Sequence, residues 1–310
     1  MRVVFMGTPE FSVPTLQSLI DSEHELIGVI TQPDKAKGRG KAVQFTPVKE
    51  KALEYDIPVY QPVKVKSPEF VEVLKELNPD VIVVIAFGQI LSKEILELPK
   101  YGCINVHASL LPKLRGSAPI QWAVINGEEK SGVTIMQMDV GIDTGDMYLK
   151  EEIVLDAKET GGSLHDKLAV MGGPLILEAL KMAEAGTLVG EKQNDEEANY
   201  IKMLDKALGN IDFTKPSVEI ERLIRGLNPW PSAYTSLNGK TLKIWDADVL
   251  EGDFEGQCGE VVQITKDALI VKTGEGALAL KEVQLEGKKR MDTGAFLRGF
   301  EVVKGTKLGE

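Results

Sequence analysis

The sequence predicts an α/β protein, with a doubly wound, mostly parallel sheet followed by a small β-barrel. Up to about residue 185, strand-like and helix-like segments alternate, which is typical of βαβ units. After about residue 208, short strand-like runs separated by glycine turns follow one another, which is typical of a barrel. The chain has 310 residues, and single cores usually stop growing at about 250–300. We therefore expect a domain at 1–188, a linker at 189–208 and a second domain at 209–310.

The elements of the first domain follow from apolar runs and helix caps. Strands are predicted at 2–6, 25–31, 59–60, 81–86, 103–107 and 131–138. Helices are predicted at 11–22, 48–54, 67–77, 93–98, 118–126 and 163–185. The run 81–86 is apolar throughout, as strands covered on both faces are. Ser67 is a good N-cap with Pro68 at N1, and Gly172-Gly173-Pro174 marks a place where the last helix could kink.

The second domain differs in texture from the first. A polar stretch at 193–199 lacks a strong period and belongs to the predicted linker. One helix is predicted at 218–225. Strands are predicted at 234–237, 242–247, 259–264, 268–272 and 277–283. Asn238-Gly239 between two of these strands is a strong hairpin signal. Barrels of this size commonly bind nucleic acids or sugar chains on one face.

Composition narrows the class of protein. The net charge is −11, which argues against wholesale nucleic-acid binding because phosphate contacts need Lys and Arg. Only two cysteines are present, Cys103 and Cys258, too far apart in sequence to suggest a disulfide framework or a zinc site. No apolar run reaches the roughly 18 residues of a membrane helix, and the chain enters a predicted strand at once, without room for a signal peptide. We expect a cytoplasmic protein with no membrane partner.

One local stretch runs against the acidic average. Lys35, Lys37, Arg39 and Lys41 are spaced by small residues, and no acidic residue lies between Lys35 and Lys49. Such a segment can be a solvated surface loop, or a flexible finger that contacts phosphates. The sequence of the segment alone does not decide between the two.

The turn after the first strand disfavours a dinucleotide site. A dinucleotide fingerprint needs G-x-G-x-x-G at this place. Gly7 is present, but Pro9 stands at the second glycine position and Ser12 at the third. NAD binding is therefore not expected, despite the similar sheet.

The segment 103–112 carries the strongest chemical signal. Asn105 and His107 are two residues apart in a predicted strand, so their side chains project from the same face. Open α/β sheets bind ligands at the carboxyl ends of their strands. The acidic run from Asp139 to Asp146 can bring Asp143 to the same place. The other histidines, His24 and His165, are expected to be structural or solvated.

These residue types suit acyl transfer. An amine that attacks a formyl or acyl carbon produces a tetrahedral species with a negatively charged oxygen. Asn105 and protonated His107 can donate N–H groups to that oxygen, and one such donor is typically worth about 10²–10³ in rate. Asp143 can hydrogen-bond to His107 and help to remove the proton released by the amine. No metal is expected, because one histidine and scattered carboxylates give no recognised ligand spacing.

These motifs resemble the 10-formyltetrahydrofolate-dependent formyltransferases. Asn105-Val-His107-Ala-Ser-Leu-Leu-Pro112 looks like the N-x-H-x-S-L-L-P signature of that superfamily, and the match is closest to the branch that acts on methionyl-tRNA. The resemblance spans nearly the whole chain. Further matching stretches are Phe5-Met-Gly-Thr-Pro-Glu-Phe11, Thr31-Gln-Pro-Asp34, Gly38-Arg-Gly-Lys41, Arg115-Gly-Ser-Ala-Pro-Ile-Gln121, 132–147, Asn228-Pro-Trp-Pro231 and Gly287-Lys-Lys289.

The resemblance implies a Rossmann-like formyltransferase fold followed by an OB-like β-barrel domain. It also implies transfer of a formyl group from 10-formyltetrahydrofolate to the methionine of initiator methionyl-tRNA. It implies that Asn105, His107 and Asp143 are catalytic. The implied folate-binding residues are Ser109, Leu110, Leu111, Pro112, Phe87, Gly88, Val140 and Gly141. The implied tRNA-binding residues are Lys35, Lys37, Arg39 and Lys41, with the barrel contacting the flank of the tRNA. A monomer suffices for all of this.

Two alternatives stay open at this stage. Relatives use the same three residues to formylate small amines such as amino-sugar nucleotides. In those relatives a histidine commonly occupies the position of Met136. A non-catalytic RNA-binding module on a degenerate α/β scaffold is the second alternative, and the intact Asn105, His107 and Asp143 argue against it.

Overall fold

The computed structural model describes residues 1–37 and 42–309. These residues form two compact units that do not follow a single cut in the chain. The first unit holds Met1–Gly116, Lys130–Val154 and His165–Ile201, and the second holds Ser117–Glu129, Leu155–Leu164 and Lys202–Glu310. The domain boundaries at 188 and 208 stay predictions.

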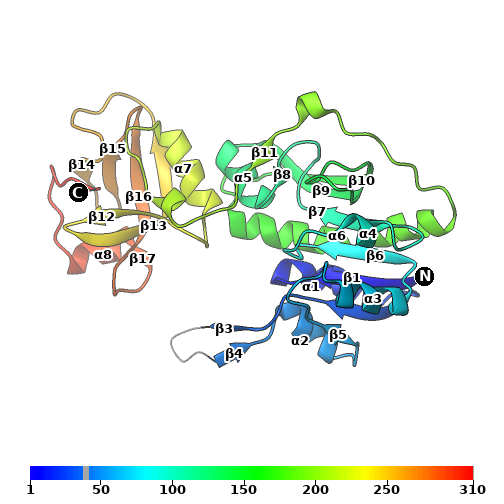
Figure 1. Cartoon of the computed structure of the whole chain (residues 1–310). Coiled ribbons are helices and arrows are strands. Elements are labelled where there is room, and N and C mark those ends of the chain that lie inside the picture. The colour runs from blue at the N-terminus through cyan, green and yellow to red at the C-terminus, as the bar shows by residue number, and fades with distance from the viewer. Residues whose placement is uncertain (38–41, 310) are drawn as a thin grey trace. The chain divides into compact units, whose positions relative to one another are not determined.

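The first unit is built on one sheet (Figure 1). In the described part of the chain it has seven strands in the order β10-β9-β7-β6-β1-β2-β5. The strands are β1 (Arg2–Gly7), β2 (Glu25–Ile30), β5 (Val59–Tyr60), β6 (Val81–Ile85), β7 (Cys103–His107), β9 (Lys130–Gln137) and β10 (Met147–Val154). The pairings from β5 to β7 are parallel, whereas β9 and β10 are antiparallel. The mostly parallel sheet is confirmed. Strand β10 is not among the predicted strands, because its charged, exposed side chains give no apolar run.

Helices cover both faces of this sheet. They are α1 (Val13–Ile20), α2 (Pro47–Leu53), α3 (Pro68–Leu77), α4 (Lys93–Leu96) and α6 (Gly161–Glu184), with a short 3₁₀ turn η1 (Glu10–Ser12) before α1. Buried residues of α3 and α4 share one core with β1, β2, β6 and β7. The Oγ atom of Ser67 accepts a hydrogen bond from Phe70 N, which confirms the predicted cap of α3.

The glycine pair in α6 serves close packing. The helix is continuous through Pro174. A Cβ atom on Gly172 would lie 2.8 Å from Val106 Cγ1 on β7, and one on Gly173 would lie 2.1 Å from Ser18 Oγ on α1. Both positions therefore need glycine, so that α6 can approach the sheet and α1.

The basic segment is more regular at its base than the loop that the sequence predicts. β3 (Lys35–Lys37) and β4 (Ala42–Gln44) pair as antiparallel strands. Lys35 is exposed. Arg39 and Lys41 lie outside the described residues.

The second unit carries a mostly antiparallel sheet in the order β12-β13-β16-β15-β14, with β17 paired to β16. Its strands are β12 (Ala233–Leu237), β13 (Lys240–Leu250), β14 (Val261–Ile264), β15 (Leu269–Lys272), β16 (Ala277–Leu285) and β17 (Met291–Asp292). Its helices are α5 (Pro119–Asn126), α7 (Ser217–Gly226), α8 (Thr293–Gly299) and the 3₁₀ turn η3 (Ala207–Gly209). Asn238 and Gly239 both have positive φ, at 50° and 72°, as the predicted hairpin turn requires.

Three short elements complete the first unit. β8 (Arg115–Gly116) pairs in parallel with β11 (Tyr200–Ile201), and η2 (Asp195–Glu197) precedes β11. The polar stretch within the predicted linker is thus attached to the first unit. Across residues 1–37 and 42–309, no helix is long and apolar enough to cross a membrane.

Candidate functional site

The candidate site begins on β7, where Asn105 and His107 project from the same face. Asn105 lies between Val84 of β6 and Met136 of β9, and His107 lies opposite Thr134 of β9. Asn105 is 9% exposed and His107 is 6% exposed. Buried polar side chains are normally hydrogen-bonded. Their protein partners therefore decide which atoms remain for a substrate.

Two hydroxyl groups hold the turn after β7. Ser109 Oγ donates a hydrogen bond to Lys113 O at 2.7 Å. Thr134 Oγ1 donates to Ser109 O at 2.7 Å and accepts from Leu111 N at 3.1 Å. Thr134 thus fixes the predicted folate-binding turn. Nothing in the sequence distinguishes this threonine from an ordinary strand residue.

The loop between β9 and β10 brings Asp143 to His107. Because β9 is antiparallel to β7, Gln137 at the end of β9 pairs with Ile104, near the start of β7. The loop must therefore travel back along β7 to reach His107. It is closed at its neck, where Gln137 N donates to Asp146 O at 2.8 Å.

The carboxylate of Asp143 has one fixed oxygen and one oxygen directed at His107. Oδ2 accepts a hydrogen bond from Gly116 N at 2.7 Å. Oδ1 lies 3.7 Å from His107 Nδ1, which is an ion-pair distance and exceeds a hydrogen bond. The expected direct hydrogen bond is therefore not formed. Asp143 has φ +54°, a left-handed conformation that costs a non-glycine residue free energy and often occurs at functional sites.

Three polar groups at this point are left without hydrogen-bond partners among the described residues. They are the side-chain amide of Asn105, Nδ1 of His107 and Oδ1 of Asp143. The other ring nitrogen, His107 Nε2, lies 3.2 Å from Leu114 O. Since a carbonyl oxygen only accepts, Nε2 carries a proton, and Nδ1 is the ring atom available to a ligand. The arrangement offers one amide donor, one imidazole nitrogen and one carboxylate oxygen to a small polar group.

A buried arginine beside this site is absent from the predicted functional residues. Arg115 is only 2% exposed. Its Nε donates to Gln193 Oε1 at 3.0 Å, Nη1 to Tyr200 OH at 3.1 Å and Nη2 to Asp195 Oδ1 at 2.8 Å. Burial alone would lower the pKa of Arg115, but the hydrogen bonds to Asp195 and Tyr200 leave it raised. Arg115 stands in a motif shared with formyltransferases, which could have indicated it, whereas no motif contains Gln193.

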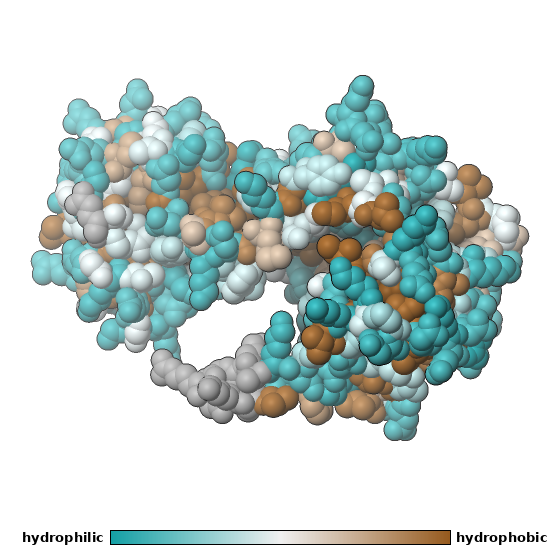
Figure 2. All heavy atoms as spheres, in the orientation of Figure 1, coloured by the Kyte–Doolittle hydropathy of each residue, from teal (hydrophilic) through white to brown (hydrophobic). Residues whose placement is uncertain are grey.

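The predicted folate-binding residues lie on three neighbouring segments. Ser109, Leu110, Leu111 and Pro112 form the turn after β7, and the side chain of Leu111 packs against Met136 and Met147. Val140 and Gly141 lie on the loop that carries Asp143. Val140 is 76% exposed, so its side chain is accessible to a ligand. Apolar residues also gather among polar ones on the visible face of the first unit (Figure 2).

Phe87 and Gly88 follow β6, the strand next to β7. Phe87 is 2% exposed and belongs to the core below α3 and α4. Its carbonyl oxygen accepts hydrogen bonds from Thr8 Oγ1 at 3.0 Å and Gln32 Nε2 at 3.1 Å. Gly88 has φ +82°, which glycine adopts without strain. The matching stretches around Thr8 and Gln32 thus fix the backbone beside this site.

An ion pair anchors the base of the basic segment. Lys49 Nζ donates to Asp34 Oδ2 at 2.5 Å and to Gln61 Oε1 at 2.8 Å. Gln61 Nε2 donates in turn to Asp34 Oδ1 at 2.8 Å. The hydrogen bond from Lys49 is the main reason why the pKa of Asp34 is lowered. Lys35 and Lys37 begin immediately after this anchor, on β3.

The other two histidines do not lie at the site. His24 Nδ1 is 3.4 Å from the N-terminal amine, and burial lowers the pKa of this imidazole. His165 Nδ1 is 2.9 Å from Asp166 Oδ1, and its ring packs 5.3 Å from that of Phe11. Within the described ranges, no group of three or more His, Cys, Asp and Glu residues is placed to hold a metal ion.

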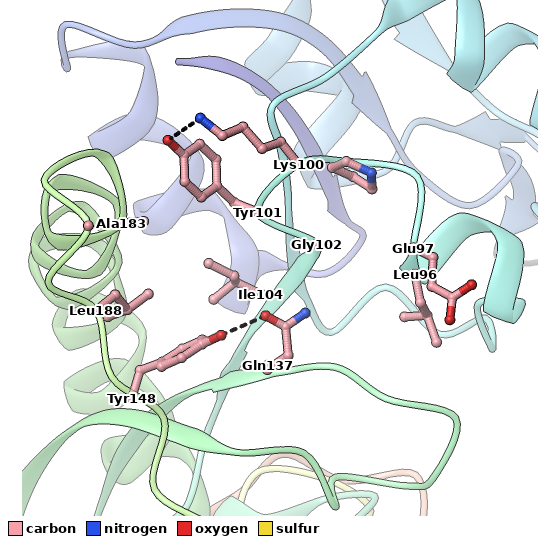
Figure 3. A pocket seen from close by; sticks show the side chains of 12 residues that line it. Leu96, Glu97, Lys100, Tyr101, Gly102, Ile104, Gln137, Tyr148, Ala183 and Leu188 are labelled. Carbon is pink, nitrogen blue, oxygen red and sulfur yellow. Dashed lines mark hydrogen bonds between the residues drawn. The ribbon is translucent and has the colours of Figure 1, made fainter.

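A separate pocket of about 540 Å³ lies at the opposite end of β7 (Figure 3). Ile104 and Gln137 line it, and their side chains point to the face of the sheet away from Asn105. Tyr148 OH donates to Gln137 Oε1 at 2.7 Å across one wall (Figure 3). The pocket therefore borders the neck of the Asp143 loop, and not its tip.

Comparison with known families matches both parts of the chain. Residues 1–180 match the family described as "Formyl transferase". Residues 203–301 match "Formyl transferase, C-terminal domain". Together the two matches cover the strands of both sheets.

Individual proteins are similar over the full length. The chain is 60% identical over 306 residues to a methionyl-tRNA formyltransferase of Agathobacter rectalis, covering 99% of each chain. It is 55% identical over 315 residues to one of Lachnospira eligens, covering 100% of each. Among solved structures, an N-formyltransferase of Helicobacter canadensis in complex with folinic acid and dTDP-3-aminofucose is similar, with a TM-score of 0.68 and 21% identity. That match covers 90% of this chain and 98% of the other. The structural likeness concerns the fold alone.

Proposed function

Because the chain belongs to the methionyl-tRNA formyltransferase family, we propose that it transfers the formyl group of 10-formyltetrahydrofolate to the α-amino group of methionine on initiator methionyl-tRNA. The products would be N-formylmethionyl-tRNA for translation initiation and tetrahydrofolate, whose N10 gains a proton when its bond to the formyl carbon breaks. The observation that carries this proposal at the site is the set of three groups on Asn105, His107 and Asp143 that lack hydrogen-bond partners among the described residues. They suit attack by an amine on a formyl carbon.

Asn105 and His107 stabilise the developing oxyanion in this proposal. When the amine attacks, negative charge develops on the formyl oxygen. The Asn105 amide and protonated Nδ1 of His107 donate to that oxygen from the same face of β7. Both side chains are buried, and donors fixed in a site that excludes water interact more strongly than they do in water.

Asp143 accepts the proton of the attacking amine in this proposal. Oδ2 is fixed by Gly116 N, so that Oδ1 is held beside His107 Nδ1. Hydrogen bonds in catalytic sites often tighten only when substrate is bound, and 3.7 Å leaves room for such a change. Oδ1 can accept the proton that the attacking amine loses, directly or through a water molecule.

The residues present fit a folate co-substrate. A pterin needs apolar surface and a few polar contacts. Leu111, Met136 and Met147 form a buried apolar cluster that supports the turn after β7, and exposed Val140 supplies an apolar side chain on the Asp143 loop. Ser109 to Pro112, Phe87, Gly88 and Gly141 complete the proposed contacts. When bound, the co-substrate supplies the formyl group, and the chain's residues orient it.

The tRNA is proposed to contact two basic regions. Lys35, Lys37, Arg39 and Lys41 form one in the first unit. In the second unit, the ring of Trp245 lies 4.7 Å from Arg290 Cζ and 5.5 Å from Lys243 Nζ, and Lys288 and Lys289 are exposed nearby in sequence. Aromatic rings among cations suit stacking and phosphate contacts. Local basic regions of this kind allow a chain with a net charge of −11 to bind RNA.

The oligomeric state of the chain and its cellular compartment are also proposals. We expect one chain to act as a monomer. We expect it in the cytoplasm, without a membrane partner, where initiator tRNA is charged. Light scattering at micromolar concentration tests the first point, and a stable dimer would contradict it.

A formyl-transfer assay tests the proposed substrate. The enzyme receives 10-formyltetrahydrofolate together with initiator methionyl-tRNA, glycinamide ribonucleotide or an amino-sugar nucleotide in parallel. We expect formylation of the tRNA alone. Formylation of a small amine with none on the tRNA would overturn the proposal.

A salt titration tests the basic segment. Changing Lys35, Lys37, Arg39 and Lys41 together to alanine should raise KM for tRNA and flatten its dependence on salt. The log–log slope should fall by up to about 0.9 for each phosphate that the protein no longer neutralises. The matched control changes Lys64 and Lys66, two exposed lysines of the same unit. An equal slope in wild type and the quadruple variant would remove the segment from the interface.

A further inference from the structure

Gln193 is hydrogen-bonded to the loop that carries Asp143. Its side-chain amide has two N–H groups, and both are used on that loop. Nε2 donates to Asp143 O at 2.8 Å and to Gly145 O at 2.8 Å. These contacts hold the backbone of Asp143 itself, in the left-handed conformation that this residue adopts at φ +54°.

Arg115 holds Gln193 in turn. Its guanidinium donates from Nε to Gln193 Oε1, which fixes which end of the amide faces the loop. The next residue, Gly116, donates its backbone N–H to Asp143 Oδ2 at 2.7 Å. Asp143 is thus held at two points, at its carbonyl oxygen by Gln193 and at its carboxylate by Gly116. Both Gln193 and Gly116 are connected to Arg115, the first by a hydrogen bond and the second by the peptide bond.

The same segment also reaches His107. Leu114 O lies 3.2 Å from His107 Nε2. The backbone of Leu114 is held because its N–H donates to Asn199 Oδ1. Arg115 N donates to Asn199 O at 3.0 Å. Residues 193–200 therefore support both members of the Asp143–His107 pair, although neither Gln193 nor Asn199 lies on the strands of the site.

We propose that Gln193, oriented by Arg115, is a positioning residue that sets Asp143 Oδ1 against His107 Nδ1. Gln193 touches no reacting atom and acts through the backbone of Asp143. The kinetic test of this inference rests on the proposed function, because it needs the proposed substrates. The position of Asp143 relative to His107 can be tested without substrate. A displacement of about 1 Å at a reacting group can lower the rate about 10²-fold, so the hydrogen bonds of Gln193 matter beyond their own free energy.

The first test is NMR on the full chain, labelled at its histidine rings. The chain has only three histidines, so the ring signals of His24, His107 and His165 are readily resolved. At fixed pH, Gln193→Leu should move the His107 ring nitrogen signals in the same direction as Asp143→Asn does, while His24 and His165 stay unmoved. Gln193→Glu should act similarly, because it keeps an acceptor for Arg115 but loses both N–H donors.

The second test is kinetic. Gln193→Leu and Gln193→Glu should lower kcat about 10- to 100-fold, with KM for either substrate changed less than about threefold. The matched control is Tyr148→Phe, which removes one hydrogen bond at the neck of the same loop (Figure 3). It should leave His107 signals and kcat within about twofold of wild type, because the tip of the loop keeps its contacts.

The two tests separate this inference from the proposed function. If His107 signals and kcat in both Gln193 variants match those of wild type, the inference fails, even if melting temperature falls. An equal effect of Tyr148→Phe would also overturn it, because any loosening of the loop would then suffice. If the wild type does not formylate methionyl-tRNA but the NMR signals move as expected, the proposed function fails and the inference stands.

Discussion

Asp34 and Asp143 are two carboxylates of the first unit with nearly equal burial and opposite surroundings. Their side chains are 19% and 18% exposed. Both oxygens of Asp34 are engaged, one by Lys49 and the other by Gln61. Asp143 has one engaged oxygen, and its other oxygen lies 3.7 Å from an imidazole nitrogen. Burial alone therefore does not distinguish a structural carboxylate such as Asp34 from one for which we propose a catalytic role, such as Asp143.

The amides beside them differ in the same way. Gln61 donates to Asp34 and to Gln32 O, and accepts from Lys49. Asn105 has no hydrogen-bond partner for its side chain among the described residues, although it is only 9% exposed. Leaving a fully buried polar group unpaired costs about 1–3 kcal/mol, and Gln61 avoids that cost through its three hydrogen bonds. The Asn105 amide is not among the fully buried unpaired atoms of the described residues, so it remains available to solvent or to a ligand, as its proposed binding role requires.

Asp143→Asn should have the largest effect. The amide keeps the shape and can still accept from Gly116 N, but it cannot take a proton. We expect kcat to fall about 10²- to 10⁴-fold with little change in melting temperature. The matched control is Asp146→Asn on the same loop, which should retain near-normal kcat. A large fall in melting temperature with Asp143→Asn would make this carboxylate structural, like Asp34.

Asn105→Ala should come next. Removing one oxyanion donor typically lowers kcat about 10²- to 10³-fold. Because the amide lacks a protein partner, its loss should not destabilise the fold as the loss of a paired amide would. Thermal melting of Asn105→Ala beside Gln61→Ala measures this difference. If Asn105→Ala is the more destabilising of the two, the amide is structural and the comparison is wrong.

Local sequence was enough to predict most strands of the two larger sheets and the placement of Asn105 and His107 on β7. Apolar runs mark parallel strands covered on both faces, and the spacing of Asn105 and His107 places both on one face by strand geometry alone. The edge strand β10 escaped prediction because the charged, exposed residues Lys150, Glu151 and Glu152 interrupt its apolar residues. Its antiparallel partner β9 also determines how the Asp143 loop must run, which no local pattern reveals.

The supports of the site could not be predicted in the same way. Arg115 and Gln193 are 78 positions apart in the chain, and they meet only because β8 pairs with β11. A polar stretch such as 193–199 has the composition of a linker, whether or not hydrogen bonds attach it to a folded unit. Tertiary hydrogen bonds of this kind leave no periodic signal, and resemblance to a family marks Arg115 without giving its role.

Asp34→Asn should affect stability more than turnover. Loss of the charged hydrogen bond to Lys49 should cost about 1–3 kcal/mol at about pH 7. The pKa of Asp34 is lowered in the folded protein from its ordinary value of 3.8, so its stabilising contribution is present above that pH and is lost as the pH falls through the folded value. The difference in melting temperature between wild type and variant should therefore shrink below about pH 4. A constant difference from neutral pH down to about pH 3 would show that charge is not involved.

Substitution of Cys103 should have the smallest effect on turnover, although this residue lies on the same face of β7 as Asn105 and His107. Burial raises the pKa of its thiol to about 12, and the side chain is fully buried, with Sγ 3.6 Å from Ile95 O. At about pH 8 the thiolate is therefore scarce and inaccessible, and an aromatic disulfide reagent should modify Cys258 first. Cys103 should react only after denaturation, and Cys103→Ala should keep kcat within about twofold, since the hydrogen bond that it loses, from Sγ to Ile95 O, is weak and involves no proposed site residue. Rapid modification of Cys103 in the native protein would mean that the start of β7 opens to solvent. That result would contradict the distinction between a packed core at Cys103 and an accessible site at Asn105.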